Sequence, residues 1–187
     1  MTEHAHPSRL VAYRHRRDHF FAEHPHSPLN AEQRARFAGL TYFPERDDLA
    51  FDLPVDESGD GIGERIEMAT TDGKRKPFVR AGRVSFAVDG EQATLTLFRD
   101  ADQGGLFIPF RDALAGTETY EFGRYLEPQY RPDGTLEVDF NYAYNPFCAY
   151  GEGWSCPIPP EENVLPVAIR AGEGMFRLSG ATEESGG

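Results

Sequence analysis

Apolar side chains at helical spacing mark the first part of the chain. Over residues 8–23 one arc, at about 100° per residue, predicts an amphipathic helix, and this arc holds Leu10, Tyr13, Phe20 and Phe21. Ser8 suits the N-cap of that helix. Arg17 falls in the middle of the arc, where a buried charge needs a partner, so we expect Arg17 to reach one of the carboxylates of the candidate site described below.

A second, short helix is predicted directly after the first. Pro25 and Pro28 end the first helix, and Asn30 followed by Gln33 has the pattern of a capping box. Gly39 suits the residue that ends the second helix. We expect both helices to cover the rest of the protein, with three phenylalanines buried beneath them: Phe20, Phe21 and Phe37.

Beyond residue 50 the pattern changes to short runs with period-two alternation, which predicts strands. Asp89-Gly90 is a strong hairpin signal between two of these runs, and Asp133-Gly134 marks another turn. Strands are expected over residues 50–55, 63–70, 77–80, 83–88, 93–99, 106–110 and 136–140. Two later segments are expected to close the sheet, at residues 165–171 and 175–178.

These elements predict a mainly β protein: a small antiparallel barrel or a strongly bent sheet, with the two N-terminal helices packed against it. The 187 residues fit a single domain, because domains usually hold about 100–200 residues. We expect a helical N-terminal segment (8–39), a β-rich core (50–178) and flexible tails (1–7 and 179–187).

The net charge of the chain limits the kinds of partner that we expect. It has 31 acidic and 19 basic residues and a net charge of −12, and an acidic surface repels phosphate backbones, so no nucleic-acid partner is expected. No apolar run approaches the roughly 20 residues of a membrane span, and the N-terminus lacks the apolar region of a signal peptide. We therefore expect no membrane association and a cytoplasmic location. The sequence does not predict the oligomeric state.

Histidine and cysteine are placed where few catalytic or metal motifs can use them. All six histidines lie in the first 26 residues, so a histidine triad or a His-rich zinc site would have to recruit the N-terminal segment. Cys148 and Cys156 match no common zinc, redox or haem spacing. In the cytoplasm we expect both thiols to be reduced and to pack a loop. A disulfide across the loop, and a metal or catalytic thiol, are the alternatives. No metal ligand set and no cofactor are predicted.

The stretch from Gly116 to Asn163 is polar and aromatic and is the candidate site. If residues 118–124 form a strand, Tyr120 and Arg124 share one face. A phenol beside a guanidinium suits an anion. The alternative is an ordinary strand with an arginine whose head reaches water.

A second group of polar residues follows the turn at residues 133–134. Asp139 and Asn141 share a face of the predicted strand end and are poor strand formers. A hairpin at this turn would bring them beside Arg124, so we predict that Arg124 and Asp139 are neighbours. The alternative is that both residues only cap turns. Glu162 could serve as a general base where histidine is absent, although a solvated acidic turn is the favoured interpretation.

Five motifs give the chain a family resemblance. They are Ser27-Pro28-Leu29, Phe37-x-Gly39-Leu40-x-Tyr42-Phe43, Gly116-x-x-Thr119-Tyr120-x-x-Gly123-Arg124-Tyr125-Leu126, Asp139-Phe140-Asn141-x-Ala143-Tyr144-Asn145-Pro146-x-Cys148 and Cys156-Pro157-x-Pro159-Pro160-x-Glu162-Asn163. From about Leu10 to Phe176 the chain resembles a widespread bacterial and archaeal family known as domain of unknown function 1684.

The resemblance implies no established activity. It implies a set of signature positions, which are Tyr120, Arg124, Asp139, Asn141, Asn145, Cys148, Cys156, Glu162 and Asn163. The chain departs from the pattern at Leu114-Ala115, where Thr or Ser is expected, so a hydroxyl from that turn is missing.

Two main hypotheses about function follow. In the first, the protein binds a small anionic or polar ligand, with or without catalysis. Asp139 or Glu162 would act as acid or base, and the ligand would be held by Tyr120, Arg124, Asn141, Asn145 and Asn163. In the second, the protein is a non-enzymatic interaction protein, and the same residues lock a long loop. A third, weaker interpretation is a metal site that uses Cys148 and Cys156 with a carboxylate.

Overall fold

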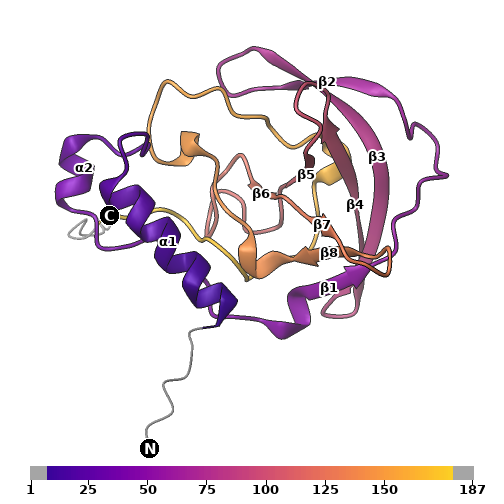
Figure 1. Cartoon of the computed structure of the whole chain (residues 1–187), viewed down its shortest axis with the longest axis horizontal. Coiled ribbons are helices and arrows are strands. Elements are labelled where there is room, and N and C mark those ends of the chain that lie inside the picture. The colour runs from indigo at the N-terminus through magenta and orange to yellow at the C-terminus, as the bar shows by residue number, and fades with distance from the viewer. Residues whose placement is uncertain (1–7, 179–187) are drawn as a thin grey trace, which may run out of the picture.

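Two antiparallel sheets and a few helices make up the regular structure of this mainly β protein (Figure 1). The structure is a computed structural model and describes residues 8–178. The tails expected at residues 1–7 and 179–187 lie outside the described residues. Within residues 8–178, no helix combines the length and the apolar character needed to cross a membrane.

The larger sheet has five strands, in the spatial order β2 (Arg65–Ala69), β3 (Arg75–Val88), β4 (Glu91–Asp100), β5 (Leu106–Phe110) and β6 (Arg124–Leu126). Asp89 and Gly90, with φ of 50° and 86°, form the turn between β3 and β4, which confirms the predicted hairpin. β3 joins two segments that were predicted as separate strands. A bulge between Arg80 and Gly82 absorbs the irregular position, so the pairing with β4 continues beyond it.

The smaller sheet has three strands, in the order β1 (Ala50–Leu53), β8 (Leu136–Asp139) and β7 (Gln129–Tyr130). The predicted turn at residues 133–134 joins β7 to β8. Arg124, however, begins β6, which pairs with β5 in the larger sheet. The expected hairpin between the strand of Arg124 and the strand of Asp139 is therefore wrong. Pro128 and Pro132 flank the two-residue β7 and cannot donate ladder hydrogen bonds, which keeps this strand short.

No closed barrel forms among residues 8–178, so that part of the fold prediction is wrong. The segments 165–171 and 175–178, which were expected to close the sheet, are not strands. Separate backbone hydrogen bonds hold them to loops, as in the bond from Met175 N to Glu118 O (2.8 Å). The positive φ of Gly172 (75°) also turns the chain away from an extended course.

The segment before β6 is a series of turns and not the strand considered above. Gly116 and Gly123 have φ of 87° and 91°, which favours glycine at both positions. A Cβ atom at Gly123 would lie 2.3 Å from the carbonyl oxygen of Phe110. Only glycine lets the chain pass this close to β5, and the turn delivers Arg124 into the protein interior.

The helices occupy the N-terminal segment and the loops. They are α1 (Arg9–Glu23) and α2 (Ala31–Ala35), with short 3-10 helices η1 (Asp47–Leu49), η2 (Phe140–Tyr142), η3 (Phe147–Ala149) and η4 (Glu161–Asn163). The hydroxyl of Ser8 accepts a hydrogen bond from Val11 N (3.2 Å). Asn30 and Gln33 form the expected capping box, with both hydrogen bonds at 2.8 Å.

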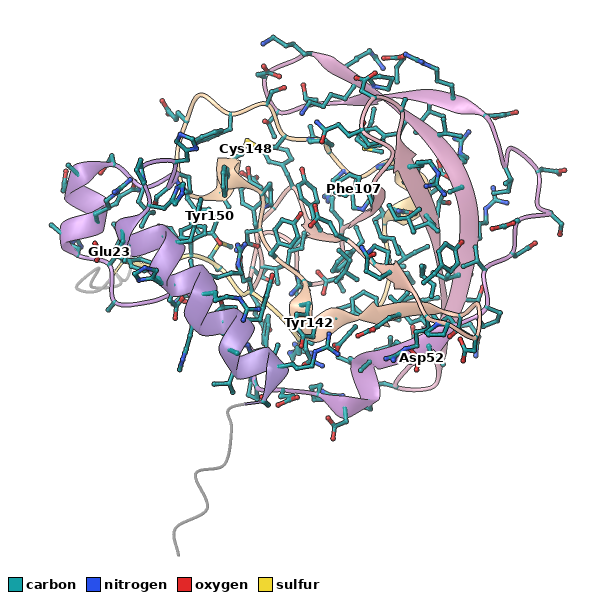
Figure 2. The ribbon with its side chains drawn as sticks, viewed as in Figure 1. Glu23, Asp52, Phe107, Tyr142, Cys148 and Tyr150 are labelled. Carbon is teal, nitrogen blue, oxygen red and sulfur yellow. A yellow bond between two sulfur atoms is a disulfide. The ribbon has the colours of Figure 1, made fainter. Side chains whose placement is uncertain are left out.

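An aromatic cluster joins α1 to the segment that follows β8 (Figure 2). Phe21 is fully buried in it, and its ring centre lies 4.6 Å from that of Tyr150. Phe20 and Phe37 are partly buried in the same cluster, so the predicted burial is complete only for Phe21. The main core draws on both sheets and includes Leu95, Leu97, Ile108, Leu136, Val138 and Phe140.

Candidate functional site

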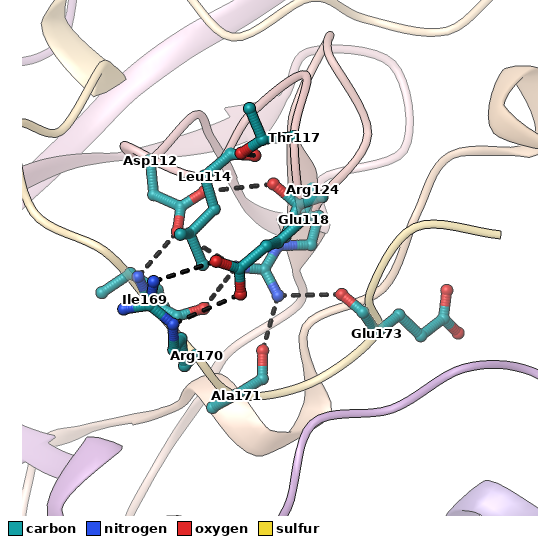
Figure 3. Close-up of polar contacts among 10 residues, drawn as sticks. Asp112, Leu114, Thr117, Glu118, Arg124, Ile169, Arg170, Ala171 and Glu173 are labelled. Atoms are coloured by element: carbon teal, nitrogen blue, oxygen red, sulfur yellow. Dashed lines mark hydrogen bonds and ion pairs between the residues drawn. The ribbon is translucent and has the colours of Figure 1, made fainter. Parts of the chain in front are cut away.

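Arg124 lies at the centre of a buried polar network (Figure 3). Its guanidinium donates hydrogen bonds to three carbonyl oxygens of the C-terminal segment, and its ion-pair partner is Asp112, at 3.5 Å. The three carbonyls belong to Ile169 (2.8 Å), Ala171 (2.5 Å) and Glu173 (2.9 Å). We call these residues the Arg124 network. The predicted contact between Arg124 and Asp139 is wrong, because their strands belong to different sheets.

Glu173 is the centre of a second buried network, which borders the first. One carboxylate oxygen accepts from Arg17 Nε (2.6 Å), and the other accepts from Asn145 N (2.8 Å) and the Tyr150 hydroxyl (2.6 Å). We call these four residues the Glu173 network. Burial raises the pKa of Tyr150 far above its usual value, and Glu173 adds to this effect. Arg17 does pair with a carboxylate, but the expected partner within residues 116–163 is wrong, because the partner is Glu173.

Sequence reasoning missed Glu173 and Asp112, the two buried acids. A signal for Glu173 exists, since it stands between two glycines in an otherwise apolar segment, Ala171-Gly172-Glu173-Gly174-Met175. Asp112 also has a signal, because one residue separates it from the end of β5, just as one residue separates Asn141 from the end of β8. Both acids accept backbone and side-chain hydrogen bonds, so they hold segments together and do not face solvent.

Glu162 and Asn163 form a third group, beside β3 and β4. Asn163 is fully buried and bonds both the N–H (2.7 Å) and the carbonyl (2.9 Å) of Thr96. Glu162 accepts from Arg80 (2.8 Å) and from the Thr96 hydroxyl (2.8 Å). Burial works to raise the pKa of Glu162, but Arg80 and Thr96 hold it below its usual value. Glu162 is therefore an ion-pair partner, and the solvated acidic turn favoured from the sequence is wrong.

The remaining predicted residues lie elsewhere. Asn141 bridges the chain near Arg46 to β8, because its amide bonds Arg46 O and Asp139 (both 2.9 Å). Tyr120 packs on Phe122, with ring centres 5.7 Å apart. The structure thus brings Asp139 to Asn141 and Glu162 to Asn163. It brings Arg124 and Asn145 together on Glu173, through the carbonyl oxygen and the carboxylate of that residue.

A disulfide joins Cys148 and Cys156, which overturns the expectation of two reduced thiols. That expectation depended on the expected cytoplasmic location and not on geometry. The fold brings the two Cα atoms to 6.5 Å, within the range that a disulfide spans. Thr71 lies beside the bridge and accepts a hydrogen bond from Cys156 N (3.2 Å). The oxidised sulfurs are not available as the metal ligands of the third hypothesis.

An open cleft lies between α1 and the β6–β7–β8 region. It has a volume of about 220 Å³, and its lining includes three tyrosines, three carboxylates and one arginine: Tyr13, Tyr142, Tyr144, Glu127, Glu137, Asp139 and Arg9. We call it the tyrosine cleft. Of the predicted site residues, Asp139 belongs to its lining. The other lining residues named here were not among those predictions.

The tyrosines of the cleft are tied to the protein frame. The rings of Tyr13 and Tyr142 meet edge to face at 4.9 Å, and the hydroxyl of Tyr144 hydrogen-bonds Glu127. Burial raises the pKa of Tyr13 to about 12 and raises the pKa of Tyr144 still further. These phenols therefore stay neutral at physiological pH and present fixed rings beside carboxylates.

No group of three or more histidine, cysteine, aspartate or glutamate side chains suited to a metal ion is found in residues 8–178. Glu137 of the tyrosine cleft already pairs with Arg131 (3.3 Å). The cleft therefore offers rings and carboxylates at its wall, and organic cations are the ligands that such a wall attracts.

Two comparisons relate the chain to known proteins. A solution NMR structure of an uncharacterized protein from Haloarcula marismortui is 41% identical, with a TM-score of 0.66, and the match covers 88% of this chain and 91% of that one. No curated protein matches. Residues 35–174 match the model of the family described as protein of unknown function (DUF1684). With most of its length matched, the chain belongs to the DUF1684 family.

Proposed function

We propose that this protein binds a small polar molecule that carries an organic cation, in the tyrosine cleft. The observation that carries the proposal is the composition of the wall, where three tyrosine rings and three carboxylates face a single arginine. Because Glu137 already pairs with Arg131, Glu127 and Asp139 stand against Arg9, which leaves the wall with an excess of one negative charge. A protonated amine is attracted both by such carboxylates and by the faces of tyrosine rings.

The protein itself supplies an example of this attraction. The guanidinium carbon of Arg17 lies 5.1 Å from the centre of the Tyr144 ring and 6.0 Å from the centre of the Tyr13 ring. Two tyrosine rings of the cleft wall therefore already contact a cation, which the protein itself supplies. The net charge of −12 also favours the approach of cations over anions.

The charge of this ligand is opposite to the one expected from the sequence. An anion would need Arg124, but this guanidinium is fully buried and donates to backbone carbonyls. Arg124, Asn141, Asn145 and Asn163 all bind the protein's own chain. Their contacts support the second hypothesis for these residues, in which the polar motif locks loops in place, while the ligand is bound beside it.

The experiment is an NMR titration of isotope-labelled protein with butylammonium, with butyrate as the probe of opposite charge. We expect butylammonium to shift resonances of the tyrosine cleft, above all those of Glu127 and Tyr142, and butyrate to leave them in place. Glu127→Gln should weaken butylammonium binding at least threefold, because one of the carboxylates is lost while the shape is kept.

Glu152→Gln is the matched control, since Glu152 is an exposed carboxylate outside the cleft. It should bind butylammonium as the unchanged protein does. Equal shifts with butyrate and butylammonium, or equal losses in both variants, would contradict a cation site in the tyrosine cleft.

A further inference from the structure

A second cleft lies beside the tyrosine cleft. It has a volume of about 250 Å³, and Glu127 and Tyr144 line both clefts. Figure 2 labels one residue of each, Tyr142 for the tyrosine cleft and Phe107 for its neighbour. Because two side chains are common to both walls, the clefts are neighbours.

The second cleft has four aromatic side chains in its wall, and we call it the aromatic cleft; Lys76 and Asp100 line it as well. The ring centre of Phe107 lies 5.4 Å from that of Phe78 and 4.8 Å from that of Tyr125. Tyr125 continues the row to Tyr144, at 5.7 Å. The hydroxyl of Tyr125 is bonded to the carbonyl of Pro157, so this residue offers its ring and not its hydroxyl. The row crosses three strands, β3, β5 and β6, and is therefore held by the sheet.

The combined size of the two clefts suits one ligand that reaches from one to the other. Small-molecule sites usually measure about 300–1,000 Å³. The tyrosine cleft (220 Å³) and the aromatic cleft (250 Å³) each lie below that range, and together they lie within it. Their chemistry differs in degree: the tyrosine cleft has three carboxylates in its lining, whereas the aromatic cleft has four rings and Lys76, and both share Glu127.

We propose that the ligand is an amphipathic amine, with its protonated nitrogen at Glu127 and an aryl or branched alkyl group in the aromatic cleft. This inference rests on the proposed function, because it assigns the remainder of the ligand whose cation occupies the tyrosine cleft. The rings of Phe107 and Tyr125 bury the apolar group, and Glu127 and Tyr144 hold the nitrogen between the two clefts.

The test compares two amines that differ in their apolar part. NMR titrations are carried out with ethylammonium and with 2-phenylethylammonium, and the dissociation constants are compared. We expect the phenyl group to strengthen binding about tenfold, because it leaves water for an aromatic surface. Only 2-phenylethylammonium should shift the resonances of Phe107.

A variant that fills the aromatic cleft isolates this contribution. Gln103 is an exposed residue that lines the cleft, so Gln103→Trp should occupy the space without disturbing the core. It should remove the tenfold advantage of 2-phenylethylammonium and leave ethylammonium binding unchanged. Gln92→Trp, at an exposed position on β4 that does not line the cleft, is the control and should change neither.

The outcomes separate the two proposals. If both amines bind equally well and Gln103→Trp has no effect, the amphipathic ligand is overturned while the cation site remains. If 2-phenylethylammonium binds with the expected advantage and loses it only in Gln103→Trp, the inference is supported. If neither amine shifts any resonance of the tyrosine cleft, both proposals fail.

Discussion

The Arg124 network and the tyrosine cleft use the same kinds of side chain and differ in where their partners come from. In the network, a guanidinium finds three carbonyl oxygens and a carboxylate within its own chain. In the cleft, Glu127 is exposed and Asp139 is half-buried, and both line an open space. Charges that the chain partners internally support the fold, whereas charges left at a cavity wall are available to a ligand.

Under the proposed function, the same difference makes the polar motif of this family a poor guide to the ligand. A buried charge needs partners, so its neighbours along the chain are constrained and form a motif that can be read in the sequence. A cleft wall needs only a shape and a charge of suitable sign, which residues from distant segments supply together. Tyr13 from α1 and Tyr142 from η2 meet in this way.

The largest effect should come from removing Arg124. Arg124→Met leaves Asp112 without its ion-pair partner and three buried carbonyls without a donor, so we expect a loss of about 3–5 kcal/mol in the free energy of unfolding. Urea denaturation measures it. Arg170→Met is the matched control, because Arg170 pairs with Glu118 at the surface (Figure 3) and should cost less than about 1 kcal/mol. Similar losses in the two variants would mean that the network does not support the fold.

The sequence predicts the fold in this protein better than it predicts the site. The hairpin at Asp89-Gly90 and the strand at residues 106–110 follow from local signals, and both are present. The predicted closed barrel is absent from the described residues. Residues 165–178, which were expected to close it, are held by side chains and isolated hydrogen bonds, and such contacts leave no periodic pattern in the sequence.

The misplaced site residues have a common cause. The prediction that Arg124 and Asp139 are neighbours assumed that the strands on either side of a turn are adjacent. The short β7 lies between β6 and β8 in the chain, and it is β7 that pairs with β8, so Arg124 and Asp139 belong to different sheets. Arg17 was placed correctly on the inward face of α1, where its side chain is partly buried, since helical spacing is a local property. Its partner Glu173 is 156 residues away in the chain, and no local pattern identifies such a pair.

The second effect concerns the disulfide, which closes the loop that carries Tyr150 of the Glu173 network. The sequence separation of 8 residues predicts a stabilisation of about 2–3 kcal/mol. The double variant Cys148→Ser/Cys156→Ser should lose that amount in urea denaturation. The unchanged protein in excess reductant should match it. Two free thiols in protein denatured without reductant would contradict the bridge.

A smaller effect should appear at alkaline pH in the tyrosine cleft. Burial raises the pKa of Tyr13 to about 12, whereas an unfolded tyrosine ionises near pH 10. The stabilisation from this shift is complete below pH 10 and is lost as the pH rises towards 12. Between pH 8 and pH 11 the unchanged protein should lose about 1 kcal/mol more than Tyr13→Phe. Parallel stability curves for the two proteins would show that Tyr13 ionises as easily in the folded state.

The smallest effect on stability should come from Glu127, whose substitution should matter most for binding. Glu127 is exposed, and its hydrogen bond to Tyr144 is its tie to the cleft wall. Glu127→Gln keeps an acceptor for that hydroxyl, so we expect a change in the free energy of unfolding within about 0.5 kcal/mol. Thermal denaturation without ligand measures it. A loss comparable to that of Arg124→Met would make Glu127 part of the internal support of the fold, and the distinction between the network and the cleft would no longer hold.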